Sequence, residues 1–342
     1  MSNVSETCHP IVRRVAAAVC AVALVPITLG SFVTTLKAGM AFADWPSSDG
    51  HNMLLYPWLR DLRHTDKFVE HGHRLAGVLI GLLSILLVVV AWRYEKRRWI
   101  RFYSLGILVA VIAQGLLGGA RVLMNRQTLA MLHSMTGALF FTFCLMLMVL
   151  TSRFWQSLRT QRDTRITTVS WATLMILPLA VGGQYCLGSA FRHLHTMLHE
   201  HIAGAVIVTV LAVSASVSLW RSDSKSLRRC GQLLACSLGF QIFLGLGSYV
   251  TRLGYPDLGY VATSGSLSQS IVCSLHTVGG MFLLGSSVIC SSAVYVLHRD
   301  GRLDGMKMMP NLTAVPYRRL DELRSPSLMA GAPVNSSERG AV

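Results

Sequence analysis

Four histidines recur at matching depths, each near the start of a long apolar run and each followed one helical turn later by glycine or alanine. Polar residues are costly inside a membrane and usually mark a functional site, so the four positions are candidate ligands. The histidines are His73, His133, His199 and His276. The small residues that follow them are Gly77, Gly137, Ala203 and Gly280.

This pattern suits the binding of haem. A neutral imidazole on a helix ligates haem iron axially, and a small residue one turn along leaves room for the porphyrin plane. Two histidines from facing helices clamp a flat macrocycle between them. Pairing His73 with His133 and His199 with His276 therefore predicts two haem sites. Hydrogen bonds between neighbouring helices are the alternative, and zinc is a weaker one because acidic or thiolate partners are missing beside three of the four histidines.

The first histidine belongs to a polar cluster, Glu70-His71-Gly72-His73-Arg74, that has no counterpart at the other three. Glu70 lies three residues before His73 and so on the same helical face, whereas Thr196 occupies that place before His199. A negative charge that merely favours the start of a helix is one explanation. A group that handles protons beside one haem is the other, and it predicts a catalytic half and a cofactor half.

Composition requires that much of the chain face lipid. Of its 342 residues, 52% are apolar and 14% are charged, and the mean hydropathy is +0.49. Runs of about 20 apolar residues are long enough to cross a bilayer as helices. The sequence thus predicts an all-α integral membrane protein. Its eight expected spans are 12–36, 70–92, 102–122, 129–151, 166–188, 197–220, 230–251 and 269–297.

The net charge of +15 is concentrated in three short connections, 93–101, 153–165 and 221–229. Because basic loops stay on the cytoplasmic side, both termini are predicted to be cytoplasmic and the histidines to lie near the outer face. The charge is then a topology signal with some attraction to anionic lipid, and nucleic-acid binding is excluded. The first apolar run follows two arginines like a signal peptide, but its length favours a retained span.

An internal repeat divides the spans into two groups of four. The segment Gln114 to Gly118 is echoed by Gln241 to Gly245, in the third and the seventh span. Because four helices return the chain to its starting side, the repeat predicts two parallel, pseudo-symmetric four-helix bundles. The expected parts are a cytoplasmic N-terminus (1–11), an N-terminal half (12–151) with an outer loop (37–69), a basic linker (152–165), a C-terminal half (166–297) and a disordered cytoplasmic tail (298–342).

Together these motifs resemble the haem A synthase family over residues 15–297. The resemblance rests on Glu70-x-x-His73-Arg74, the outer-loop stretch 38–46, the segment that begins at Gln114 and the three other histidines. Two departures stand out. The eight cysteines include no pair in the first outer loop, where some members have one, and Glu200 replaces the arginine that often follows the third histidine.

The resemblance implies an enzyme that oxidises one ring methyl of haem O to a formyl group by two successive hydroxylations, which supplies haem A to terminal oxidases. His73 and His133 would then hold the substrate haem O, Glu70 would serve catalysis, and His199 and His276 would ligate a resident haem b. It also implies a bacterial cytoplasmic membrane, a separate electron donor and haem O synthase as a partner, while a homo-oligomer stays open.

Two functions from other classes remain open on the sequence alone. A di-haem membrane cytochrome would relay electrons, for example to or from a quinone, without chemistry on either haem. A transporter built on parallel repeats would use the histidines as proton relays and bind no haem. The asymmetry at Glu70 favours the enzyme over the electron relay.

Overall fold

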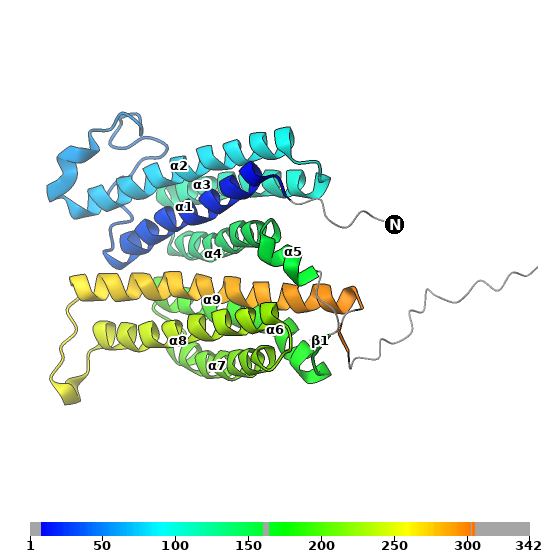
Figure 1. The fold of residues 1–342 in the computed structure, drawn as a ribbon. Helices are drawn as coiled ribbons and strands as arrows, with labels where there is room; N and C mark the ends of the chain where they lie inside the picture. Colours follow the sequence, from blue (N-terminus) through cyan, green and yellow to red (C-terminus); the bar gives the residue numbers. More distant parts are fainter. Residues whose placement is uncertain (1–7, 160–163, 302, 305–342) are drawn as a thin grey trace, which may run out of the picture. The chain divides into compact units, whose positions relative to one another are not determined.

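The computed structural model describes residues 8–159, 164–301 and 303–304, and these residues are predominantly helical (Figure 1). The eight long helices are each long and apolar enough to cross a membrane, which confirms the predicted all-α membrane protein with eight spans. Their bounds are α1 (Pro10–Thr35), α2 (Thr65–Tyr94), α3 (Arg98–Met124), α4 (Gln127–Leu150), α6 (Thr168–Leu194), α7 (Leu198–Trp220), α8 (Lys225–Leu253) and α9 (Leu267–Arg299).

Within the described residues, three shorter helices and one strand pair lie between or beside the spans. The predicted basic linker contains the seven-residue helix α5 (Arg153–Arg159) and strand β1 (Thr164–Arg165), which pairs in parallel with β2 (Leu303–Asp304). The connection between α1 and α2 contains the 3-10 helix η1 (Trp58–Arg63), and the connection between α8 and α9 contains the 3-10 helix η2 (Pro256–Leu258). Most of the predicted tail, 298–342, lies outside the described residues.

Local sequence explains where several spans begin and end. Hydroxyl side chains at Thr167, Ser224 and Ser266 accept hydrogen bonds from the first turns of α6, α8 and α9. Left-handed residues terminate two spans, Asn125 after α3 and His195 after α6. The short turns that follow bring α4 and α7 back across the bundle.

The spans pack as two four-helix groups. Helices α1 to α4 contact one another in a closed ring, α6 to α9 do the same, and α4 and α9 join the two groups (Figure 1). The relation of the groups by pseudo-symmetry stays a prediction. The long loop after α1 and the loop after α8 lie at the same end of the spans, opposite the basic connections (Figure 1).

Helix α9 occupies the centre. In its most apolar stretch 72% of the residues are buried, compared with 17–44% in the other spans. Its buried face is rich in small residues, including Gly279, Gly280 and Gly285, which allow neighbouring helices to approach closely. The central helix therefore holds His276 at a fixed position between α6, α8 and the first group.

A similar close approach joins α7 to α8 and provides a test of the packing. A Cβ atom added at Gly231 would lie 2.8 Å from the backbone oxygen of Ser216, and backbone atoms cannot move aside cheaply. We expect Gly231→Ala to destabilise the protein by about 1–3 kcal/mol, the usual cost of overpacking.

The matched control is Gly239→Ala on the same helix, where the added Cβ meets no atom within 4 Å. We expect that change to alter stability by about 0.5 kcal/mol or less. Thermal unfolding in detergent, followed by tryptophan fluorescence, measures both variants. Equal stability of the two variants would contradict the packing of α7 on α8.

Candidate functional site

The structure brings His73 and His133 together from α2 and α4. Their ring centroids lie 6.1 Å apart with the ring planes at 84°. The Nδ1 atom of His73 is 2.8 Å from the carbonyl oxygen of Pro26. Because a carbonyl only accepts hydrogen bonds, Nδ1 carries the proton and Nε2 keeps a lone pair for a metal.

A glycine on the preceding helix lies against each of these rings. A Cβ added at Gly30 would lie 2.9 Å from His73, and one added at Gly118 would lie 3.2 Å from His133. Real Cβ atoms essentially never come as close as the 2.9 Å at Gly30, and the 3.2 Å at Gly118 is tighter than most real Cβ contacts, so a larger residue at either position would press on the ring. The two glycines thus fix where the imidazoles point.

A cavity of about 320 Å³ adjoins the pair, within the usual size range of ligand pockets. Three glycines in its wall, Gly77, Gly115 and Gly137, have no atom within 4 Å of an added Cβ. The buried Nδ1 atom of His133 has no hydrogen-bond partner. Open space beside two facing imidazoles fits a flat ligand with a central metal, which is the requirement of haem.

The second pair differs from the sequence prediction. His201, and not His199, faces His276, with ring centroids 6.3 Å apart and planes at 80°. Gly188 and Gly245 lie against these rings, at 2.8 and 3.2 Å from the added Cβ. His199 is exposed at the start of α7. The geometry therefore favours His201 as the partner of His276.

A signal for His201 exists in the sequence. Gln184 precedes Gly188 by four residues, the spacing already noted at the third and the seventh span, and its amide nitrogen lies 3.0 Å from Nδ1 of His201. Glutamine side chains also lie against Gly204 and Gly279, each three residues after a paired histidine. Aligning α7 with α9 on these glycines selects His201.

The two pairs differ in the space beside them. The position one turn after His276 is Gly280, where an added Cβ would lie 3.3 Å from both Tyr185 and Gln241. The equivalent Gly77, one turn after His73, faces open space. The inequality that Glu70 indicated in the sequence thus extends to the shape of the two sites.

Glu70 is buried, with 2% of its surface exposed, and belongs to the cavity wall. One carboxylate oxygen accepts hydrogen bonds from the backbone N–H groups of Ala41 (2.8 Å) and Phe42 (3.4 Å). The other oxygen accepts from Arg74 at 2.9 Å, which is also an ion pair within α2. The carboxylate therefore connects the outer loop to the helix that carries His73.

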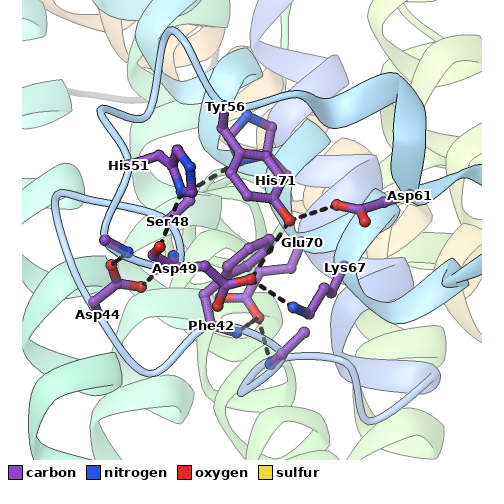
Figure 2. A network of polar contacts seen from close by, with 12 residues as sticks. Phe42, Asp44, Ser48, Asp49, His51, Tyr56, Asp61, Lys67, Glu70 and His71 are labelled. Atoms are coloured by element: carbon purple, nitrogen blue, oxygen red, sulfur yellow. Dashed lines mark hydrogen bonds and ion pairs between the residues drawn. The ribbon is translucent and has the colours of Figure 1, made fainter.

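The outer loop between α1 and α2 is held at several further points (Figure 2). Arg74 donates to the backbone oxygens of Asp44 and Ser47, at 2.9 and 2.7 Å. Lys67 forms an ion pair of 2.5 Å with Asp49, and Ser48 lies 3.2 Å from Nδ1 of His71. The loop contributes Trp45 and Met53 to the cavity wall, so it closes one side of the site.

Asp44 stabilises a turn within the outer loop, because its carboxylate accepts hydrogen bonds from the backbone N–H groups of Asp49 and Gly50. Partial burial raises the pKa of Asp44, but hydrogen bonds from the Gly50 backbone, Ser47 and the Asp49 backbone lower it more, so the net pKa lies below the ordinary value. A depressed carboxyl pKa gives stability that is present above the ordinary pKa and lost as pH falls through the lower one. The turn is therefore fully stabilised at neutral pH.

Comparison with known proteins agrees with this geometry. Residues 59–199 match the COX15-CtaA family, described as cytochrome oxidase assembly protein. The heme A synthase of Symbiobacterium thermophilum is 34% identical over 140 residues, which cover 40% of this chain and 44% of that protein. The heme A synthases of Brucella ovis and Brucella abortus are 29% identical over 119 residues, 33% of each chain. These matches support the haem A synthase family at modest identity.

The matched part of this chain spans 33% to 44% of the length of these curated relatives. The matched family segment contains Glu70, His73 and His133 and ends before His201 and His276. The first pair and its carboxylate thus lie within the family match. The second pair rests on the structure and on the internal repeat.

The choice between His199 and His201 can be tested directly. The sequence predicts a haem at the second pair, and we expect His201→Ala to lose it, because the change removes a ring that faces His276. His199→Ala, at an exposed position two residues away, should keep it. Soret absorbance per mole of purified protein measures the loss, and the reverse pattern would restore His199 as the ligand.

Proposed function

We propose, taking the haem A synthase family that the matches support as the premise, that the chain oxidises a ring methyl of haem O to a formyl group. Two successive hydroxylations would supply haem A for terminal oxidases. One observation carries the proposal: a buried carboxylate, Glu70, stands in the wall of an open cavity that also contains two facing imidazoles. A site that only holds a permanent haem needs no such carboxylate.

The residues of the cavity have separate tasks in this proposal. His73 and His133 would hold the substrate haem O, and the glycines of the cavity wall leave room for its ring. The bound haem supplies the redox chemistry, and the protein supplies orientation and electrostatics. Glu70 provides a fixed carboxylate, able to accept a proton, at the edge of the cavity.

The second pair serves as the resident cofactor site. His201 and His276 would ligate haem b, with His201 in place of His199. The side chains of Tyr185 and Gln241 close the space beside Gly280, which suits a group that stays bound rather than one that exchanges. Such a haem would supply one-electron redox chemistry near the substrate site, and a separate donor would supply the electrons.

The protein is an integral membrane protein by its eight apolar helices. We propose that it lies in a bacterial cytoplasmic membrane with both termini inside, because the basic connections lie opposite the outer loop. The histidine pairs then lie nearer the outer face, and haem O arrives from the membrane, delivered by haem O synthase. The outer loop would close over the substrate.

A di-haem electron relay is the second candidate, and the similarity of the two pairs favours it. Their centroid separations, 6.1 and 6.3 Å, and their ring angles, 84° and 80°, are nearly equal. Extraction of the haems from cells that co-produce haem O synthase distinguishes the functions. Two permanent haem b groups without haem O or haem A indicate the relay, whereas haem O or haem A indicates the enzyme.

The role of Glu70 gives the sharpest test of the enzyme. We expect Glu70→Gln to lower haem A formation by about 10²-fold or more, the usual contribution of a proton-transferring group. Haem b at the second pair should remain, because Glu70 contacts the first half only. Chromatography of extracted haems measures both quantities, and wild-type haem A from this variant would refute the assignment.

Two controls separate chemistry from closure of the loop. Asp66→Asn changes an exposed carboxylate one turn before Glu70 and should leave haem A formation unchanged. Lys67→Ala removes the ion pair with Asp49 and loosens the loop without touching Glu70. An equal loss in Lys67→Ala and Glu70→Gln would mean that Glu70 acts through the loop alone.

A further inference from the structure

Cationic side chains form one part of the cavity wall beside the first histidine pair. Arg121 and Arg192 both line the cavity, together with His193. Among the described residues, neither arginine is in an ion pair. The one acidic residue in this lining is Glu70, and its carboxylate is engaged by Arg74. The cavity thus has more positive charge than its own residues neutralise.

Arg192 is contributed to this cavity by the second helix group. It lies near the end of α6 and donates to the backbone oxygen of Ser31 (2.6 Å) and the hydroxyl of Thr35 (2.6 Å) on α1. It also donates to the backbone oxygen of Cys273 (3.2 Å) and to the hydroxyl of Thr277 on α9. All four acceptors are neutral, so they orient the guanidinium without cancelling its charge.

Within the part of the chain that the structure describes, the side chains of Arg121 and His193 also lack a negatively charged partner. Arg121 donates to the backbone oxygen of Gly39 at 2.6 Å, which fixes it beneath the outer loop. The Nε2 atom of His193 is buried and has no hydrogen-bond partner. Buried polar atoms are almost always paired, and charges within a membrane protein usually face a partner or a ligand. In the described ranges, two guanidinium groups without a counter-charge and one unpaired imidazole nitrogen belong to residues that line the same cavity, so a negatively charged ligand is the partner that is missing.

We propose that Arg192, Arg121 and His193 bind the carboxylates of a flat ligand that carries acidic groups along one edge. The proposal rests on the proposed function, since a porphyrin with free propionates belongs to this class. The two imidazoles alone would leave such a ring free to turn in its own plane. Carboxylates bound to fixed cations stop that rotation, so a single edge of the ring is presented to Glu70.

The test compares haemin with its dimethyl ester, which has the same ring and metal but no acidic groups. Each is titrated into the purified full-length protein and followed by Soret difference spectra. We expect the wild type to bind the diacid at least about tenfold more tightly than the ester. Arg192→Gln should lower that ratio several-fold while ester affinity changes little, because the ester makes no charge-assisted contact.

Arg126→Gln is the control, because Arg126 is an exposed arginine that does not line the cavity. Its ratio should match that of the wild type. Arg121→Gln provides a second variant if Arg192→Gln does not fold, since Arg192 also connects α1 to α9. Its ratio should fall as well.

The failure of this inference is distinguishable from failure of the proposed function. Equal wild-type affinity for diacid and ester, or an unchanged ratio in both arginine variants, would overturn carboxylate recognition and leave the haem cavity in place. Binding of neither ligand would overturn the cavity as a haem site, and the inference with it.

Discussion

Close approach of the helices at the paired histidines is the constraint on which the structure depends. Each of the four rings lies against a glycine on the preceding helix, where an added Cβ would come within 2.8–3.2 Å of the ring. In lipid, where the hydrophobic effect does not drive helices together, such contacts at small residues determine the packing. They hold both pairs at nearly the same separation. The glycine and histidine partners are Gly30 with His73, Gly118 with His133, Gly188 with His201 and Gly245 with His276.

The head of α2 adds a second constraint that exists in the first group alone. Glu70 binds two backbone N–H groups of the outer loop, and Arg74 binds two of its backbone oxygens. A loop held by its backbone can keep one conformation whatever its exposed side chains are. The cluster that suggested a catalytic Glu70 in the sequence therefore also shapes the cavity wall through the contacts of the same carboxylate.

Much of the fold was predictable because membrane spans are long apolar runs, and these are visible without tertiary contacts. His73 and His133 were likewise predicted as partners from their matched positions, and the structure brings their rings together with the centroids 6.1 Å apart. The choice of His201 over His199 was not predicted from the sequence. Residues two positions apart point to nearly opposite sides of a helix, and packing decides which side faces inward. Gly204 and Gly279, three residues after His201 and His276, were a usable signal.

The contacts of Arg192 were beyond prediction for a different reason. Its partners Ser31 and Cys273 are 161 and 81 residues away in the chain, and no local pattern relates them.

These contacts show that the first cavity is not a property of the first four helices. Ser31 adjoins the glycine that supports His73, and Thr277 adjoins His276, so one guanidinium touches the immediate neighbours of both histidine pairs. Met281 of α9 completes the same wall. A ligand that draws on the charge of Arg192 is therefore bound by both halves at once. The second group consequently has two tasks, to hold its own pair and to complete the site of the first.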